Sequence, residues 1–122
     1  MASVYRGKHT MLRAFRFAFD GLKLALATER NVKIHIFVAS VVIIAGLLSS
    51  LSVIEWVLLS LTISSVIAFE LVNTAIETAL DYLSPEWSKE IGQAKDLAAA
   101  AVFVVTIASV CIACFIFLPK WF

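Results

Sequence analysis

The sequence predicts an all-α membrane protein, with an N-terminal amphipathic surface helix followed by three transmembrane helices. Hydrophobic residues make up 61% and charged residues 16% of its 122 residues, against about 45–50% and about 25% in an ordinary soluble domain. Two uncharged runs, 36–54 and 97–118, are long enough to cross a bilayer. Lysine and arginine concentrate before the first run, as they do on the cytoplasmic side of membrane proteins. The length allows a single membrane-embedded domain, 1–122.

The segment 1–34 is predicted to be cytoplasmic or interfacial. A helix is expected from about His9 to Thr28, because apolar residues recur there at heptad-like spacing and share one face. These apolar residues are Leu12, Phe15, Phe19, Leu22 and Leu26. A separate polar stripe consists of Arg13, Arg16, Asp20 and Lys23. A basic stripe beside an apolar face suits a helix that lies in the membrane interface.

Three spanning helices are expected, at 36–54, 55–82 and 97–118. The first run has nineteen uncharged residues, which give about 28 Å of helix at 1.5 Å per residue, close to the ~30 Å hydrocarbon core. The second helix is uncharged only over residues 56–69, which is too short to cross. It therefore has to carry Glu70 partly into the membrane.

The connections and ends of these helices also carry signals. Ser84 is predicted to be an N-cap and Pro85 the first residue of the helix that leads into the third span. Pro119 is predicted to stop that helix, and Trp121 to anchor it at the interface.

The distribution of basic residues predicts the orientation in the membrane. Seven Lys and Arg lie in residues 1–34, none lies near Glu55 in the first connection, and two lie in residues 82–96. The N-terminus and the second connection should therefore face the cytoplasm, and the C-terminus the outside.

Several functions find no support in the sequence. A net charge of +1 without a basic stretch argues against nucleic-acid binding. Cys111 and Cys114 have the spacing of a redox pair, but they lie in an apolar run and are expected to be small helix-facing or lipid-buried residues. No phosphate-binding glycine loop occurs, so a nucleotide would have to bind without that cradle.

Four polar residues are predicted to share one side of the middle helix: Glu70, Asn73, Glu77 and Asp81. Their spacing of i, i+3, i+7 and i+11 places them within an arc of about 80°. Because a carboxylate at membrane depth costs at least ~2.5 kcal/mol, a functional site is expected. Carboxylates and an amide without His or Cys suit a hard cation such as Mg²⁺. The alternative is a proton or cation pathway in a non-enzymatic membrane protein or assembly subunit.

Two further segments are expected on the same cytoplasmic side. Glu29 precedes the first span, and Lys95 and Asp96 precede the third. Lys95 is either a point charge for a phosphate or a counter-ion of the positive-inside pattern. His35 begins the first span and is expected to be an interfacial amphipathic side chain.

The segment from Glu70 to Glu77, with Asp81 and residues 94–102, resembles the signature of the small bacterial membrane diacylglycerol kinase and undecaprenol kinase family. The resemblance extends through residues 29–31, 34–35, 53–56 and 117–120. It implies a homotrimer in the bacterial cytoplasmic membrane, with composite active sites shared between neighbouring protomers. It also implies a Mg²⁺-dependent transfer of the γ-phosphoryl group of ATP to the hydroxyl of a membrane lipid alcohol.

The resemblance also implies roles for individual residues. Glu70 corresponds to the general base for the lipid hydroxyl. Asn73 and Lys95 correspond to groups that position the hydroxyl and the phosphates.

The metal and the nucleotide are likewise assigned by resemblance. Glu29 and Glu77 correspond to the ligands of Mg²⁺ on ATP. Lys95, Asp81 and Asp96 correspond to nucleotide-side or supporting contacts.

The substrate expected from the resemblance is undecaprenol, which gives undecaprenyl phosphate. The enteric diacylglycerol kinases have an acidic residue at the position of His35, and residues 29–31, 34–35 and 53–56 look more like the undecaprenol kinase branch. Diacylglycerol, which gives phosphatidic acid, is the alternative substrate.

Overall fold

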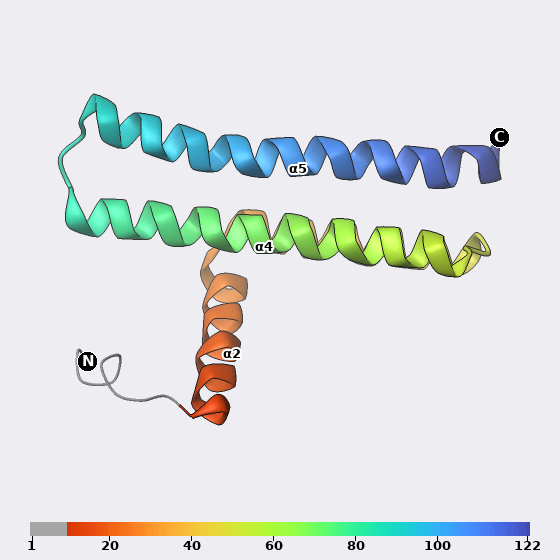
Figure 1. Ribbon diagram of the computed structural model, residues 1–122, viewed down its shortest axis with the longest axis horizontal. Coiled ribbons are helices and arrows are strands. Elements are labelled where there is room, and N and C mark those ends of the chain that lie inside the picture. The colour runs from red at the N-terminus through yellow and green to blue at the C-terminus, as the bar shows by residue number, and fades with distance from the viewer. Residues whose placement is uncertain (1–9) are drawn as a thin grey trace. The chain divides into compact units, whose positions relative to one another are not determined.

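The computed structural model describes residues 10–122, which form helices joined by short connections (Figure 1). In chain order these are α2 (Met11–Thr28), α3 (Arg30–Leu48), α4 (Val53–Leu83) and α5 (Lys89–Trp121). The chain divides into two compact units, Met1–Arg30 and Asn31–Phe122, which are described separately. Helices α3, α4 and α5 are each long and apolar enough to cross a membrane. The prediction of three helices that are long and apolar enough to cross a membrane is thereby confirmed.

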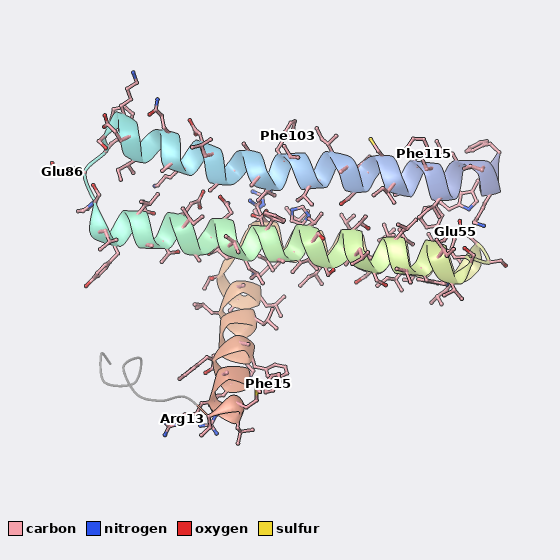
Figure 2. All side chains as sticks on the ribbon, viewed as in Figure 1. Arg13, Phe15, Glu55, Glu86, Phe103 and Phe115 are labelled. Carbon is pink, nitrogen blue, oxygen red and sulfur yellow. The ribbon has the colours of Figure 1, made fainter. Side chains whose placement is uncertain are left out.

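In the first unit, α2 begins after Thr10, whose hydroxyl accepts a hydrogen bond from the backbone N–H of Arg13 at 3.3 Å. The predicted helix is confirmed over Met11–Thr28, and its expected start near His9 lies outside the described residues. Arg13 and Phe15 both project from the first turns of this helix (Figure 2).

Helix α3 has as many residues as the predicted span 36–54 but begins and ends six residues earlier, so the predicted end is wrong. It ends at Leu48, and Ser50 adopts a left-handed backbone conformation with φ 53°. Helix α4 then begins with a reciprocal cap: the hydroxyl of Ser52 accepts from the N–H of Glu55 at 3.2 Å, and the Glu55 carboxylate accepts from the N–H of Ser52 at 3.0 Å. This capping box sets the boundary inside an uncharged run, where hydropathy alone gives no signal.

The connection between α4 and α5 also differs from the prediction. Ser84 ends α4, because its backbone N–H donates to the carbonyl of Leu80 at 2.8 Å and closes the last turn. The predicted helix start at Ser84 and Pro85 is therefore wrong. Ser88 is the N-cap instead, and α5 begins at Lys89.

Helix α5 continues without a break into the third span and past its predicted stop at Pro119. Pro119 has no N–H to donate to the carbonyl of Phe115 four residues before it, and the helix ends two residues later at Trp121. Side-chain contacts hold this last turn in place. Trp121 Nε1 donates to Ser49 Oγ at 2.9 Å, and Lys120 Nζ lies 3.2 Å from the carboxylate of Glu55.

Within the second unit, α5 runs back along α4, and the two helices lie side by side (Figure 1). Leu59 of α4 packs with Ile116 and Phe117 of α5 in a small buried cluster. Helix α3 approaches α4 closely at Gly46, where an added Cβ would lie 2.8 Å from the indole ring of Trp56.

Most other large apolar side chains of the three long helices face outward. Phe103 and Phe115 lie on the side of α5 that points away from α4 (Figure 2), and both are exposed. Exposed apolar surface of this extent requires lipid or another protein chain as its cover.

Candidate active site

A buried carboxylate lies in the middle of α4. Glu70 is only 3% exposed, and its Oε2 lies 3.6 Å from Nε2 of His35 on α3. Burying a carboxylate is costly unless it is paired or used. The contact with His35 was not predicted, since helical periodicity within one segment carries no information about a residue 35 positions away.

Asn73 lies one turn further along α4 and is also buried, at 8% exposure. Within residues 10–122 its Oδ1 has no hydrogen-bond partner, and neither has the buried Oγ1 of Thr106 on α5. Buried polar atoms without a partner are rare, and each calls for a water, ion or ligand that completes it. Thr106 was not singled out from the sequence, because a lone threonine in an apolar run has no distinguishing pattern.

The register of α4 against α5 places Thr106 level with Glu70. Asp81 pairs with Lys95, and Leu59 packs on Phe117. These two contacts are 22 residues apart in both helices. Glu70 precedes Asp81 by 11 residues and Thr106 follows Lys95 by 11, so the two lie at the same height of the antiparallel pair.

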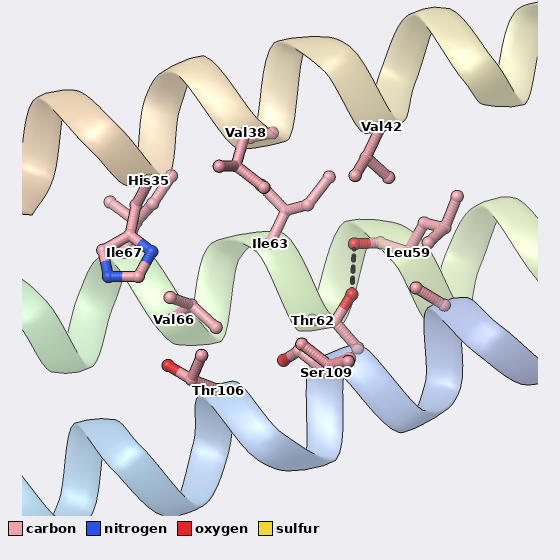
Figure 3. A pocket seen from close by; sticks show the side chains of 13 residues that line it. His35, Val38, Val42, Leu59, Thr62, Ile63, Val66, Ile67, Thr106 and Ser109 are labelled. Atoms are coloured by element: carbon pink, nitrogen blue, oxygen red, sulfur yellow. Dashed lines mark hydrogen bonds between the residues drawn. The ribbon is translucent and has the colours of Figure 1, made fainter.

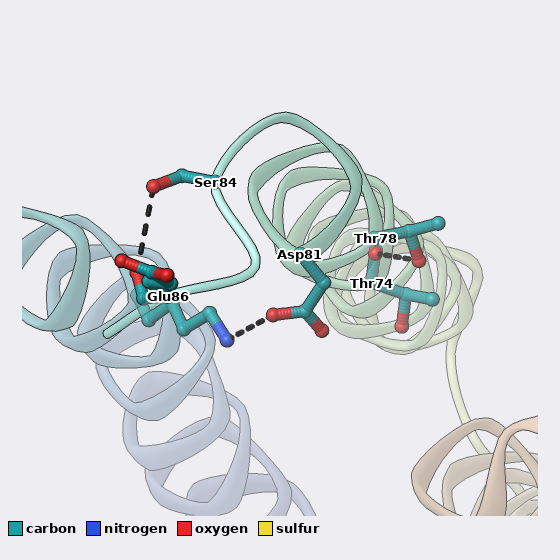
Figure 4. A network of polar contacts seen from close by, with 6 residues as sticks. Thr74, Thr78, Asp81, Ser84 and Glu86 are labelled. Atoms are coloured by element: carbon teal, nitrogen blue, oxygen red, sulfur yellow. Dashed lines mark hydrogen bonds and ion pairs between the residues drawn. The ribbon is translucent and has the colours of Figure 1, made fainter. Parts of the chain in front are cut away.

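Nearer the α4–α5 connection, Lys95 Nζ contacts Oδ1 of Asp81 at 2.5 Å. The Lys95 side chain is 34% and that of Asp81 66% exposed, so this pair lies at the surface of the helices. Figure 4 shows Asp81 facing α5, and Thr74 and Thr78 joined by a hydrogen bond along α4. The segment before the third span, which was expected on the same side as the acidic stripe, contacts that stripe through this pair.

The remaining predicted site residues are Glu29, Glu77 and Asp96. Glu77 is half-buried, Asp96 is exposed, and neither is paired with a basic side chain within residues 10–122. Glu29 ends α2 in the other unit, where its carboxylate accepts a hydrogen bond from Thr28 at 3.4 Å. No three His, Cys, Asp or Glu side chains gather as a metal site in the described part of the chain.

A cavity of about 120 Å³ lies between α3, α4 and α5 (Figure 3). His35 of α3 and Thr106 and Ser109 of α5 lie on its wall, and the rest of the lining is mostly apolar. Helix α4 contributes Thr62, whose hydroxyl is occupied by a hydrogen bond to the carbonyl of Leu59 at 2.9 Å. The cavity therefore joins an apolar interior to the histidine that contacts Glu70.

Known proteins are similar to this chain over most of its length. The family model of prokaryotic diacylglycerol kinase matches residues 16–117. An undecaprenol kinase of Bacillus subtilis is 40% identical over 88% of both chains. A diacylglycerol kinase of Synechocystis sp. is 39% identical over 89% of this chain, which spans 63% of that relative. A diacylglycerol kinase of Haemophilus influenzae is 30% identical over 77% of this chain and 80% of its own.

The matched region contains the acidic residues of α4, the Asp81–Lys95 pair and all of the cavity. Three apolar helices that could span a membrane and a buried carboxylate are consistent with this match. The chain therefore belongs to the prokaryotic diacylglycerol kinase family, a family of lipid kinases.

Proposed function

We propose that the protein transfers the γ-phosphoryl group of ATP, with Mg²⁺, to the hydroxyl of a membrane lipid alcohol, and that this alcohol is undecaprenol. One observation carries the proposal: in a chain of this kinase family, Glu70 is buried in the middle of an apolar helix with a histidine beside it. A general base that acts on a lipid hydroxyl has to lie at such a place, within the membrane and away from water.

Phosphoryl transfer needs positioning and neutralisation of charge more than it needs covalent chemistry from the protein. In the proposed reaction Glu70 accepts the proton of the lipid hydroxyl. The lipid oxygen bonds to the γ-phosphorus of ATP as the bond from this phosphorus to the β-phosphate breaks, and ADP leaves. Asn73 fits the role of a positioning group, because its buried Oδ1 has no partner among the described residues and could accept a hydrogen bond.

Mg²⁺ characteristically binds one or two carboxylates together with the phosphates of a nucleotide, and keeps several waters. Glu77, half-buried and without a basic partner among the described residues, fits such a site. We propose that Glu29 and Glu77 hold the ion, which neutralises phosphate charge when bound. Lys95 then contacts the phosphates, while Asp81 and Asp96 support the nucleotide side.

We also propose the setting of this site. The N-terminus, α2 and the α4–α5 connection lie on the cytoplasmic side of the bacterial inner membrane, with α2 as an amphipathic helix at the interface. The basic residues of 1–34 support this orientation.

A homotrimer with shared active sites completes the proposal. Glu77 supports it, because this carboxylate on a membrane-spanning helix is only half-buried and has no basic partner among the described residues, and lipid cannot solvate it. The mass of the protein in detergent micelles tests this arrangement. Three chains are expected, and a fully active monomer would contradict it.

Two relatives bear on the choice of lipid. The Bacillus undecaprenol kinase matches at 40% identity along nearly the whole of both chains, which supports undecaprenol. The Synechocystis diacylglycerol kinase matches almost as well, at 39%, and makes diacylglycerol the second candidate.

A mixed-micelle kinase assay with γ-labelled ATP tests both. Undecaprenol and diacylglycerol are offered separately and then together at equal mole fraction, with Mg²⁺ or with a chelator. We expect the label to appear in undecaprenyl phosphate, and more label in this product than in phosphatidic acid when both lipids are present. With the chelator we expect no labelled lipid. Preference for diacylglycerol would replace the proposed substrate, and transfer to neither lipid would reject the kinase reaction.

A further inference from the structure

We propose that the cavity between α3, α4 and α5 holds the hydroxyl-bearing end of the lipid alcohol, and that Thr106 is a substrate-positioning residue within it. The inference rests on the proposed function and adds to it a residue that neither the sequence pattern nor the family match assigns. It starts from the unpaired hydroxyl of Thr106.

The cavity wall carries three hydroxyl groups, and two of them donate hydrogen bonds to backbone carbonyls of their own helix. Thr62 donates to the carbonyl of Leu59 at 2.9 Å, and Ser109 to that of Val105 at 2.7 Å. The hydroxyl of Thr106 is buried and has no partner in the described part of the chain. A rotation of this side chain toward the cavity would let the hydroxyl bind a molecule there without breaking a hydrogen bond of the described residues.

Thr106 lies at the same height as Glu70 in the antiparallel pair of α4 and α5. The ring of His35, which also lines the cavity, lies 3.6 Å from the Glu70 carboxylate. Figure 3 shows His35 and Thr106 pointing into the same end of the space between the helices. This end of the cavity carries two polar side chains, and one of them, His35, contacts the proposed general base.

Away from His35 and Thr106, the wall of the cavity is formed mainly by aliphatic side chains. Val38 and Val110 line the cavity and are 49% and 57% exposed, so the cavity reaches the outer surface of the helices. A molecule with one hydroxyl on a long branched hydrocarbon chain fits this lining, because its polar atom meets the polar end and its chain continues into lipid.

In the resulting arrangement, the substrate oxygen accepts a hydrogen bond from Thr106 Oγ1 and directs its own proton toward Glu70. The first branched unit of the chain fills the apolar part of the cavity. Undecaprenol has no polar group next to its hydroxyl, whereas the ester groups of diacylglycerol would be placed against aliphatic side chains without partners.

A pair of matched variants tests the role of Thr106. Thr106→Val and Thr62→Val make the same change in the same cavity, but only the first removes a free hydroxyl. With undecaprenol as the probe, we expect Thr106→Val to raise the KM for the lipid by about 2–12-fold, with the KM for MgATP unchanged. Thr62→Val should leave the KM for the lipid within twofold of the wild-type value.

Thermal unfolding without substrate supplies a second readout. Thr106→Val should be at least as stable as the wild type, since it breaks no hydrogen bond within the protein. A purely structural role for Thr106 predicts a loss of stability instead.

The cavity itself is tested by adding volume inside and outside it. Val42 lines the cavity, and its neighbour Val41 is exposed. We expect Val42→Phe to lower kcat/KM for undecaprenol at least tenfold and Val41→Phe to have little effect.

Equal KM values for the two threonine variants, or equal activity of the two phenylalanine variants, would overturn this inference while the kinase reaction stands. A wild-type protein that phosphorylates no lipid alcohol would reject the proposed function, and this inference with it.

Discussion

The replacement of Glu70 by glutamine is the sharpest perturbation of the proposed mechanism. Glutamine has the same shape, so the packing against His35 is preserved, but it cannot accept the proton of the lipid hydroxyl at neutral pH. Positioned general bases contribute about 10²–10⁴-fold to rate, which corresponds to about 2.7–5.4 kcal/mol of the barrier.

The structure indicates that no neighbouring carboxylate replaces Glu70. Glu77, the next acid on α4, is seven residues on, or about 10.5 Å along the helix axis. A proton transfer needs heavy atoms within about 2.6–3.2 Å. His35 is the one titratable group in contact with Glu70 in the described chain. If its imidazole accepted the proton in place of Glu70, the loss of activity would lie near the lower end of the expected range.

The assay is steady-state transfer of labelled phosphate to undecaprenol in mixed micelles. We expect Glu70→Gln to lower kcat at least 10²-fold, with the KM for MgATP within about threefold of the wild-type value. Glu86→Gln, in the exposed α4–α5 connection, is the matched control and should retain full activity. A Glu70→Gln variant with kcat within threefold of the wild type would remove Glu70 from the role of base.

Three further predictions follow from the site and the fold. Glu77→Ala should raise the Mg²⁺ concentration for half-maximal activity at least tenfold, because a ligand of the ion is lost, and an unchanged Mg²⁺ titration would refute that role. Lys95→Met should raise the KM for MgATP by about 10–150-fold, which corresponds to the loss of one hydrogen bond to a charged group. Asp81→Asn breaks only an exposed ion pair and should change the KM for MgATP by at most about fivefold. Equal effects of the two variants would show that Lys95 acts through Asp81. Gly46→Ala should lower the free energy of unfolding by about 1–3 kcal/mol, because its Cβ meets the indole ring at 2.8 Å, while Gly21→Ala has no atom within 4 Å and should lose none; equal thermal stability of the two variants would contradict the close packing at Gly46.

Features that recur along a single helix, such as apolar runs and polar stripes, could be predicted from the sequence. Two of the three spans follow from uninterrupted apolar runs, and the middle span follows from a shorter run that continues into the acidic stripe. The stripe itself follows from the spacing of Glu70, Asn73, Glu77 and Asp81. The approach of Lys95 to Asp81 was also foreseeable, because consecutive antiparallel helices bring the two sides of one connection together.

Two kinds of feature were not predictable in this way: the choice between two possible cap residues, and contacts that depend on the register of one helix against another. Ser84 and Ser88 both suit an N-cap, and the choice depends on a single backbone hydrogen bond that extends α4. The contact of His35 with Glu70 and the position of Thr106 depend on how far one helix is shifted along another. That shift results from side-chain packing between helices, which the periodicity of a single helix does not encode.

The stoichiometry of the products tests the central claim most directly. The purified protein is incubated with MgATP and undecaprenol in lipid vesicles, and ADP and the phosphorylated lipid are measured together by mass spectrometry. We expect one undecaprenyl phosphate for each ADP, with both products formed at least 10²-fold more slowly when Glu70→Gln replaces the wild type. Formation of ADP without a phosphorylated lipid, or of neither product by the wild-type protein, would contradict it.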